Sequence, residues 1–262
     1  MKIGIVCYPT FGGSGVLATE LGIELSKKGY EIHFITYNQP VKLELLSNKV
    51  HYHEVMVPDY PLFHYQPYEL ALSTKVVDMV KKHEIELLHV HYAIPHAYAA
   101  YMAKNMLKHE GINIPVVTTL HGTDITLVGS HPSYKAAVKF SINKSDAVTA
   151  VSESLKRDTE ELFSIDTNIE VIPNFINLEK YPLERKEKTR SIVAENDEKV
   201  ICHISNFREV KRIDDVINIF HNINKKIPSK LMMVGEGPEK ANAKKLYKKL
   251  KIKDNVFFFG NT

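Results

Sequence analysis

Short runs of β-branched and apolar residues alternate with stretches of helical length along almost the whole chain. Ile3–Tyr8, Glu31–Thr36 and Leu87–His91 are runs of this kind, and amphipathic stretches such as Glu69–His83 separate them. Short apolar runs that alternate with helices form βαβ units, whose strands pair in parallel within one sheet. The pattern therefore predicts an α/β fold built on mostly parallel sheets.

The alternation continues to Ile172 and then gives way to a charged, polar stretch from Glu184 to Lys199, which is typical of a linker. The strands expected before it are Ile3–Tyr8, Glu31–Thr36, Val50–Val57, Leu87–His91, Val116–Leu120, Ala147–Val151 and Ile169–Ile172. The helices expected between them are Gly15–Lys28, Glu69–His83, Pro95–His109, Ser133–Asn143 and Glu153–Phe163. We expect Ser152 to cap the last of these helices.

A second series of strands and helices follows the charged stretch. It consists of the strand Lys199–Ser205, the helix Arg212–Lys225, the strand Lys230–Val234, the helix Pro238–Leu250 and the strand Val256–Phe259. Two series predict two Rossmann-like, doubly wound domains, residues 1–175 and 176–262, and a chain of 262 residues suits that number. Because such a sheet normally has five or six strands, we expect the second domain to be incomplete in this chain.

The charge of the chain argues against nucleic acid as a partner. The formal net charge is only +3, whereas nucleic-acid-binding domains carry a strongly basic face. The first residues enter a strand without a signal-peptide pattern, and no apolar run approaches the roughly 20 residues that span a bilayer. We therefore expect a cytoplasmic protein with no stable membrane insertion and with buried, reduced thiols at Cys7 and Cys202. The sequence leaves open whether the protein is a homo-oligomer.

Two loops that follow predicted strands of the first half are candidates for ligand contact. In the segment Pro9–Gly15, glycines let a ligand approach the backbone and the N–H groups of the next helix. Its spacing is not G-x-G-x-x-G, so a dinucleotide-binding loop is a weak interpretation. The second loop places His121 and Asp124 around a glycine. It is either a tight turn with Asp124 capping a short helix, or a site in which His121 hydrogen-bonds a sugar, with Thr119 and Asp124 nearby.

Histidines gather around the predicted strand Leu87–His91. His89 and His91 alternate on one face of it, and His96 follows. A zinc site would need further ligands at close spacing, which no neighbouring cysteine or carboxylate supplies. We therefore interpret these histidines, together with Tyr92, as polar residues that line a cleft.

Two loops of the second half place cations and glycines after adjacent predicted strands. Arg208 can hold a pyrophosphate through its planar fork, and Lys211 can hold it as a point charge. Gly235 and Gly237 permit a close approach to the backbone. The sequence contains no D-x-D motif of the kind that binds a nucleotide sugar through a divalent metal. We therefore expect Arg208 and Lys211 to replace the metal, and we expect neither a metal nor another cofactor.

Together these motifs resemble glycosyltransferase family 4 over nearly the whole chain. The resemblance is carried by Gly12-Gly13-Ser14-Gly15, His121-Gly122-Thr123-Asp124, Pro173-Asn174, Arg208 with Lys211, and Gly235-Glu236-Gly237-Pro238. It implies a GT-B fold, in which an acceptor-side domain and a nucleotide-sugar-binding domain face each other across a cleft. Phe175 and Ser205-Asn206-Phe207 depart from the Pro-Asn-Gly and Gly-Arg-Leu patterns that are common in the family.

A narrower resemblance rests on four longer phrases. They are Tyr8–Val16, His89–His96, Leu120–Thr126 and Ser205–Arg212. These phrases resemble the members of the family that act in bacillithiol biosynthesis. This resemblance implies transfer of N-acetylglucosamine from UDP-N-acetylglucosamine to the hydroxyl of L-malate, with retention at the anomeric carbon. The alternatives are a lipid or another small acceptor, or a sugar-nucleotide-binding module without turnover.

The resemblance also implies roles for single residues. The catalytic residues would be His121, which contacts the sugar, and Arg208 and Lys211, which stabilise the leaving diphosphate. The donor would be bound by Gly13, Asn206, Arg208, Lys211, Gly235 and Gly237. The malate acceptor would be bound by Ser14, Tyr92, Thr119 and Asn174. Two glutamates spaced by seven residues would complete the donor site beyond Thr262, so a chain that ends there is expected to bind the donor weakly.

Overall fold

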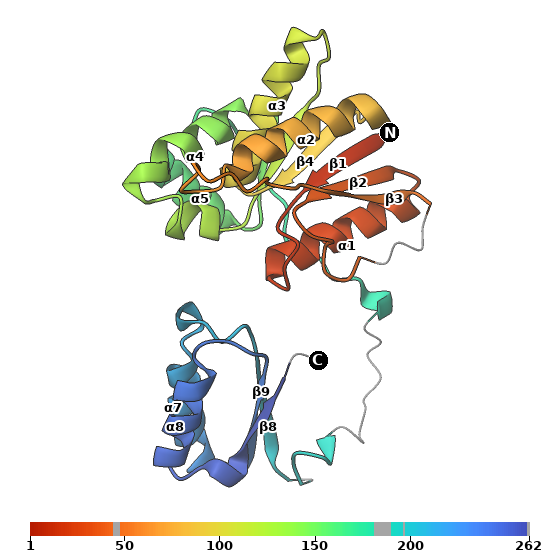
Figure 1. Ribbon diagram of the computed structural model, residues 1–262. Coiled ribbons are helices and arrows are strands. Elements are labelled where there is room, and N and C mark those ends of the chain that lie inside the picture. Colours follow the sequence, from red (N-terminus) through yellow and green to blue (C-terminus); the bar gives the residue numbers. More distant parts are fainter. Residues whose placement is uncertain (44–47, 181–189, 196, 261–262) are drawn as a thin grey trace. The chain divides into compact units, whose positions relative to one another are not determined.

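The computed structural model describes residues 1–43, 48–180, 190–195 and 197–260 (Figure 1). These residues form two compact units, Met1–Ile176 and Asn177–Thr262. The boundary lies one residue beyond the division drawn from the sequence. Each unit contains a parallel sheet and the helices that connect its strands.

Unit 1 is built on a seven-stranded sheet in the order β3-β2-β1-β4-β5-β6-β7, and all of its strand pairs are parallel. The strands are β1 Lys2–Val6, β2 Glu31–Thr36, β3 Val50–Glu54, β4 Leu87–His91, β5 Val116–Leu120, β6 Ala147–Ala150 and β7 Ile169–Val171. Each predicted strand of the first half is present. The order places β4 in the centre and β3 and β7 at the two edges.

The helices of unit 1 cover both faces of this sheet (Figure 1). They are α1 Gly13–Lys27, α2 Tyr68–His83, α3 Tyr98–His109, α4 Pro132–Lys144 and α5 Glu153–Phe163. On one face Ala18 of α1 packs with Ile5 and Phe34, and on the other Val76 of α2 and Ala100 of α3 join a second cluster of buried residues. This two-sided cover is the doubly wound arrangement that the alternating pattern predicts.

Two helix starts show how local sequence sets the boundaries. Ser152 accepts a hydrogen bond from Leu155 N at 3.1 Å, which confirms it as the N-cap of α5. The helix predicted from Pro95 begins instead at Tyr98, because Ile94 is extended and a short π-helical turn, Ala93–Ala97, intervenes. Among the described residues, no helix is both long enough and apolar enough to cross a membrane.

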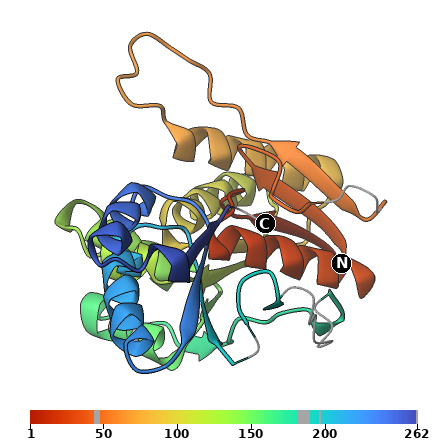
Figure 2. The same ribbon diagram turned by 90° about the horizontal axis from the view of Figure 1, so that it is seen from below.

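The segment between β3 and α2 exposes apolar side chains to solvent. Figure 2 shows it (light orange) standing clear of the sheet and helices of unit 1. Leu62 is 81% exposed and Tyr65 is 83% exposed, and Tyr60 and Met56 are exposed as well. No lysine or arginine lies between Val55 and Pro67 in the sequence, so the segment is apolar without being basic.

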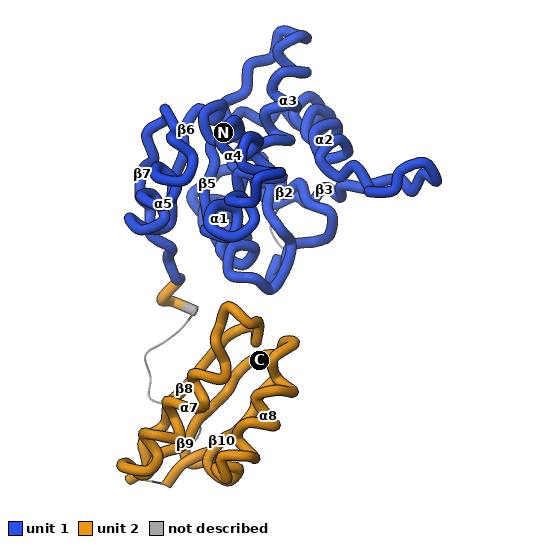
Figure 3. Tube along the Cα trace, turned by 90° about the vertical axis from the view of Figure 1, so that its left-hand side faces the viewer, with its two compact units in different colours: residues 1–176 blue, residues 177–262 orange. Residues whose placement is uncertain are grey.

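Unit 2 has a three-stranded parallel sheet in the order β10-β9-β8 (Figure 3, orange). Its elements are β8 Lys199–Ile204, α7 Ile213–Asn224, β9 Ser229–Val234, α8 Lys240–Lys249 and β10 Val256–Phe259. Leu231 and Met233 alternate on the face of β9 that packs against Phe220 of α7 and Tyr247 of α8. Each predicted strand and helix of the second series is present.

Cys202 is exposed, and the prediction of a buried thiol there is wrong. Its neighbour Ile201 packs in the core that contains residues of α7 and α8, and successive residues of a strand point to opposite faces. Cys202 therefore lies on the opposite face of β8, where Ile204 is 74% exposed. Cys7 is buried, as expected.

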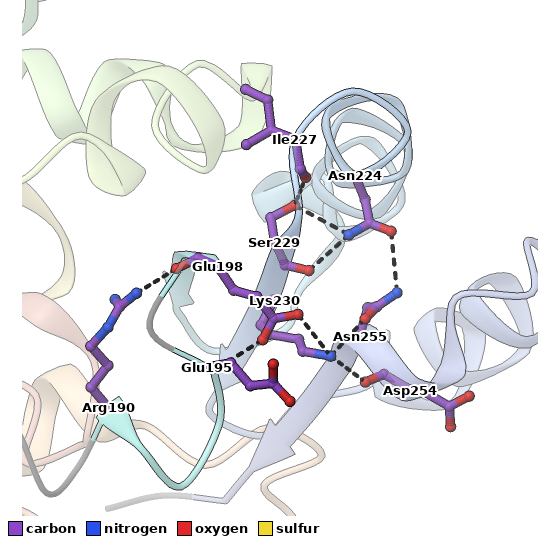
Figure 4. Close-up of polar contacts among 9 residues, drawn as sticks. All are labelled: Arg190, Glu195, Glu198, Asn224, Ile227, Ser229, Lys230, Asp254 and Asn255. Carbon is purple, nitrogen blue, oxygen red and sulfur yellow. Dashed lines mark hydrogen bonds and ion pairs between the residues drawn. The ribbon is translucent and has the colours of Figure 1, made fainter.

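A polar network holds the amino-terminal end of the unit 2 sheet (Figure 4). Lys230 Nζ lies 3.3 Å from Glu198 Oε1 and donates to Asn255 Oδ1 at 2.8 Å. Asn255 Nδ2 donates to Asn224 Oδ1 at 3.2 Å, and Asn224 Nδ2 donates to Ser229 O at 2.7 Å. The network ties the end of α7 to all three strands at the end opposite to the loops predicted to bind the donor.

Candidate active site

The glycine-rich loop of unit 1 joins β1 to α1, and α1 begins at Gly13. A Cβ atom on Gly15 would lie 2.3 Å from Tyr8 O and 2.6 Å from Thr10 O, so the loop folds too closely on the helix for any side chain. A Cβ atom on Gly13 would meet nothing within 4 Å. The loop thus needs a glycine at position 15, while the space beside Gly13 is open.

These two glycines give a matched pair of variants. Gly15→Ala is expected to destabilise unit 1 by about 1–3 kcal/mol, because the added methyl group forces the loop and helix apart. Gly13→Ala is expected to leave the stability within about 0.5 kcal/mol of the parent chain. Urea unfolding followed by circular dichroism measures both. Equal stabilities for the two variants would contradict the close packing at Gly15.

Tyr92 links the loops that follow β1, β4 and β5. It has a left-handed backbone (φ 85°), a conformation that is costly for a residue with a side chain and that is concentrated at functional sites. Its hydroxyl is hydrogen-bonded to Ser14 Oγ at 2.7 Å. Its ring lies 5.2 Å from the ring of His121 and 5.2 Å from that of Tyr8. Three of the predicted site residues, Ser14, Tyr92 and His121, therefore meet at the carboxyl ends of adjacent strands.

Tyr8 is a member of this group that the sequence interpretation missed. Its ring packs on His96 at 4.6 Å as well as on Tyr92, and burial raises the pKa of its hydroxyl to about 12. It therefore stays a neutral hydrogen-bonding group throughout the physiological range. Its position directly before the glycine-rich loop is the signal that could have identified it.

Asp124 fastens the loop after β5 to the turn after β4. It is buried, and its Oδ1 accepts hydrogen bonds from His121 N at 3.1 Å and Gly122 N at 3.0 Å. Its Oδ2 accepts from Ala93 N at 2.9 Å. The tight-turn interpretation is supported, although Gly122 and not Asp124 precedes the short helical turn Thr123–Leu127.

The histidines of β4 lie beneath the loops rather than in an open cleft. His91 and His96 are fully buried, so the interpretation of these two as cleft-lining residues is wrong. His91 Nδ1 is hydrogen-bonded to His121 Nε2 at 2.8 Å, and His96 Nδ1 donates to His91 O at 2.6 Å. His89 Nε2 is hydrogen-bonded to Thr119 Oγ1 at 2.8 Å. Because β4 is central and covered on both faces, its histidines are enclosed, and they hydrogen-bond to Thr119 and His121.

This buried layer makes the stability of unit 1 depend on pH. Burial lowers the pKa of His89, His96 and His121 from 6.5 to about 4, and it lowers the pKa of His91 well below 6.5. Between pH 6.5 and 4 the unfolded chain therefore binds more protons than the folded chain, and stability falls as the pH falls. Asp124 acts in the opposite sense, because burial raises its pKa from 3.8 to about 6, and it offsets part of this loss.

The expected result is a decrease in Tm of roughly 10 °C between pH 7 and pH 5. Differential scanning calorimetry across this range, at constant ionic strength, measures the change. A Tm that stays constant from pH 7 to pH 5 would contradict the burial of neutral imidazoles.

Asn174 stands apart from the other predicted acceptor residues. It is exposed and follows β7, the edge strand. β6 separates β7 from β5, which carries Thr119. The structure thus groups Ser14, Tyr92 and Thr119 with His121 and places Asn174 outside the group.

The predicted cations of unit 2 lie on one turn after β8. Lys211 N donates to Arg208 O at 2.8 Å, within a short 3-10 turn, and both side chains are exposed. Burial and the charge of Lys211 lower the pKa of His203, which lies in β8. Asn206 is exposed on the same loop. The turn thus presents two positive charges at the carboxyl end of the strand.

The glycines of the next loop pack against this turn. Gly235 has φ 126°, and a Cβ atom on it would lie 2.0 Å from Ser205 O. A Cβ atom on Gly237 would lie 2.6 Å from both Phe207 N and Phe207 O. Phe207 N also donates to Glu236 O at 2.9 Å. The structure therefore brings the predicted donor-binding residues of unit 2 together in one pair of loops.

Two protein families match the sequence. Residues 11–180 match Glycosyltransferase Family 4, and residues 184–262 match Glycosyl transferases group 1. The first match includes the loops after β4 and β5, and the second includes the cations and glycines of unit 2. Both groups of candidate residues therefore lie within the matched segments.

Curated relatives match almost the full length of the chain. The N-acetyl-alpha-D-glucosaminyl L-malate synthase of Bacillus anthracis is 46% identical over 261 residues, which are 99% of this chain and 68% of that protein. An uncharacterized glycosyltransferase of Methanocaldococcus jannaschii is 25% identical over 96% of this chain and 62% of its own length. The alpha-monoglucosyldiacylglycerol synthase of Streptococcus pneumoniae is 23% identical over 99% of this chain and 61% of its own length.

Solved structures share the fold. A glycosyltransferase from Rickettsia africae matches with a TM-score of 0.76 at 21% identity, over 100% of this chain and 68% of its own. Anabaena HepE in complex with UDP and glucose matches with a TM-score of 0.74 at 17% identity, over 100% of this chain and 70% of its own. These likenesses confirm the α/β fold of GT-B type. The family match over most of unit 1 and the identity to the Bacillus anthracis protein show that this chain belongs to glycosyltransferase family 4.

Proposed function

We propose that the protein containing this chain transfers N-acetylglucosamine from UDP-N-acetylglucosamine to the hydroxyl of L-malate, the first step of bacillithiol biosynthesis. The observation that carries this proposal is the 46% identity to the Bacillus anthracis malate synthase over 99% of the chain. The contacts among Ser14, Tyr92 and His121 support it, because they gather hydrogen-bonding groups suited to a small hydroxy acid and a sugar.

In this proposal Arg208 and Lys211 stabilise the leaving diphosphate without a metal ion. Charge develops on the diphosphate as the bond to the sugar breaks, and fixed cations stabilise such charge without reorganising. Both side chains are exposed on one turn at the carboxyl end of β8, where ligands of parallel α/β sheets bind. Gly235 and Gly237 keep the neighbouring backbone free of side chains.

We further propose that the transfer proceeds with retention by displacement on a single face of the sugar. A double displacement would need a carboxylate nucleophile, and the oxygens of Asp124 accept three backbone N–H groups. The leaving phosphate oxygen would then take the proton of the acceptor hydroxyl. His121, whose Nε2 is held by His91, would offer Nδ1 to the sugar.

One observation favours a second candidate, a lipid acceptor. The segment between β3 and α2 exposes Leu62 and Tyr65, and the Streptococcus pneumoniae relative is named for a glucosyldiacylglycerol product. The segment lacks the lysines and arginines that attract anionic lipid headgroups. L-malate therefore remains the proposed acceptor.

Acceptor choice is tested by UDP release from UDP-N-acetylglucosamine. We expect release with L-malate to exceed that with other hydroxy acids or with diacylglycerol vesicles by roughly 100-fold or more, because the acceptor site pairs specific polar groups. Water alone as the acceptor is the control for hydrolysis. Release that requires the vesicles would contradict the malate assignment and support the lipid acceptor.

A further inference from the structure

Four histidines and one glutamate form a cluster on one face of the unit 1 sheet. Glu31 and His33 come from β2, His51 and His53 come from β3, and His83 ends α2. The register pairs His33 with His51. Because alternate residues of a strand share a face, Glu31 and His33 of β2 lie on the same face of the sheet as His51 and His53 of β3. The ring of His33 lies 4.6 Å from that of His51, 5.2 Å from that of His53 and 4.8 Å from that of His83.

Two nitrogen atoms of this cluster are buried and make no hydrogen bond. They are His33 Nε2 and His51 Nε2, which have no hydrogen-bond partner among the residues that the structure describes. Both lie close to the same carboxylate oxygen, Glu31 Oε1, at 3.3 Å and 3.2 Å respectively. Leaving buried polar atoms without a hydrogen bond costs free energy, so such atoms require an explanation.

The distances among these atoms suit a shared metal ion. Ligands bound tetrahedrally to zinc at about 2.0–2.1 Å lie about 3.3–3.4 Å from one another. The separations of Glu31 Oε1 from His33 Nε2 and His51 Nε2, 3.3 Å and 3.2 Å, match this spacing. The three ligand atoms all lie within 4.8 Å of one another. A small movement of the exposed side chains would therefore complete the geometry.

The second nitrogen of His33 is also hydrogen-bonded, here to an imidazole in place of the carboxylate, carbonyl or water that usually accepts from a metal-bound histidine. His33 Nδ1 lies 2.9 Å from His53 Nε2 in a hydrogen bond. When Nε2 binds a metal, the proton resides on Nδ1, which then donates to His53.

The cluster is accessible from solvent, and two nearby lysines act against a bound cation. The side chains of Glu31 and His51 are 37% and 36% exposed, whereas that of His33 is fully buried, so one side of the cluster is open to solvent. The positive charges of Lys2, which influences Glu31, and of Lys75, which influences His53, oppose a bound cation. Lys2 is itself paired, with Glu84 Oε2 at 3.2 Å.

We propose that Glu31 Oε1, His33 Nε2 and His51 Nε2 bind a divalent transition-metal ion of the zinc class, with solvent as the fourth ligand. Imidazole and carboxylate ligands in this combination suit zinc, nickel and copper better than magnesium or calcium. His53 is a positioning residue that orients the ring of His33. The ion joins β2 to the edge strand β3 and lies away from the carboxyl-end loops for which the sequence predicts no metal.

The test uses the full chain after chelator treatment, with Co²⁺ and Zn²⁺ as probes. We expect one equivalent of Co²⁺ to give the visible absorption of a tetrahedral site, Zn²⁺ to displace it, and Zn²⁺ to raise the Tm. Glu31→Gln and His51→Asn are expected to weaken Zn²⁺ binding by roughly 100-fold or more, and His53→Asn by roughly 10–100-fold. His109→Asn, which removes an exposed histidine at the end of α3, is the matched control and is expected to bind normally.

Two outcomes overturn the proposal. The first is a parent chain that binds Zn²⁺ no more tightly than the Glu31→Gln variant. The second is a His109→Asn variant that loses as much affinity as His51→Asn, which would mean that surface histidines hold the ion. Circular dichroism of each variant without metal shows whether the variant is folded, and so distinguishes the loss of a metal ligand from a failure to fold. Glu31 and His51 are partly exposed, so their variants are expected to fold.

Discussion

Replacing either Arg208 or Lys211 with alanine is expected to lower turnover by roughly 10²–10³-fold, because each removes one fixed charge from the leaving diphosphate. Both side chains are exposed on one short turn, so neither substitution is expected to change the stability of unit 2. The measurement is the steady-state rate of UDP release with L-malate, in the protein that contains this chain. The loss should appear mainly in kcat, because the charge develops as the bond breaks.

The neighbouring cation supplies the control for this prediction. Arg212 is also exposed but forms an ion pair with Asp215 at the start of α7. Arg212→Ala is therefore expected to keep a rate within a few-fold of the parent protein. Near-normal rates for both Arg208→Ala and Lys211→Ala would mean that the diphosphate binds elsewhere. Equal losses for all three variants would indicate a nonspecific effect of charge.

Replacing Asp124 with alanine is expected to destabilise unit 1 by about 3 kcal/mol or more, because three backbone N–H groups lose their acceptor. Two of these groups belong to the loop of His121 and the third belongs to Ala93, next to Tyr92. The variant is therefore also expected to lose most of its turnover, since both loops are released. Chemical unfolding measures the first effect and UDP release measures the second.

A conservative variant distinguishes the hydrogen bonds accepted by Asp124 Oδ1 from the one accepted by Asp124 Oδ2. In Asp124→Asn the amide oxygen can still accept from His121 N and Gly122 N, but the amide nitrogen would face the N–H group of Ala93. Its stability is expected to lie between those of the parent and the alanine variant. Asp78→Ala removes an exposed carboxylate of α2 and is the control. A stable, active Asp124→Ala variant would contradict the conclusion that Asp124 holds the loop after β5 to the turn after β4.

The alternation of apolar runs and helical stretches was sufficient to predict the strands and helices of both units. Strand boundaries such as Leu87–His91 and Val116–Leu120 are as predicted, because buried parallel strands are short, apolar and bounded by polar residues. The contact between Ser14 and Tyr92 also follows from the rule that the carboxyl ends of parallel strands meet at one edge. The roles predicted for the site residues remain predictions.

Other features depend on contacts that a single sequence does not encode locally. Asp124 reaches a backbone group 31 positions away in the chain, and no local pattern distinguishes that contact from a cap. Cys202 lies in an apolar run, but which face of β8 is covered depends on where α7 and α8 pack. The cluster around His33 arises from the register of β2 with β3, although the alternating Glu31, His33 and His51, His53 could have suggested a shared face.

The most direct test of the account is a crystal structure of the protein that contains this chain, with UDP bound and with chelator present. We expect both phosphates to contact the side chains of Arg208 and Lys211, and we expect the affinity for UDP to be unchanged by adding Mg²⁺. Phosphates located away from these two cations, or UDP binding that requires the divalent ion, would contradict it.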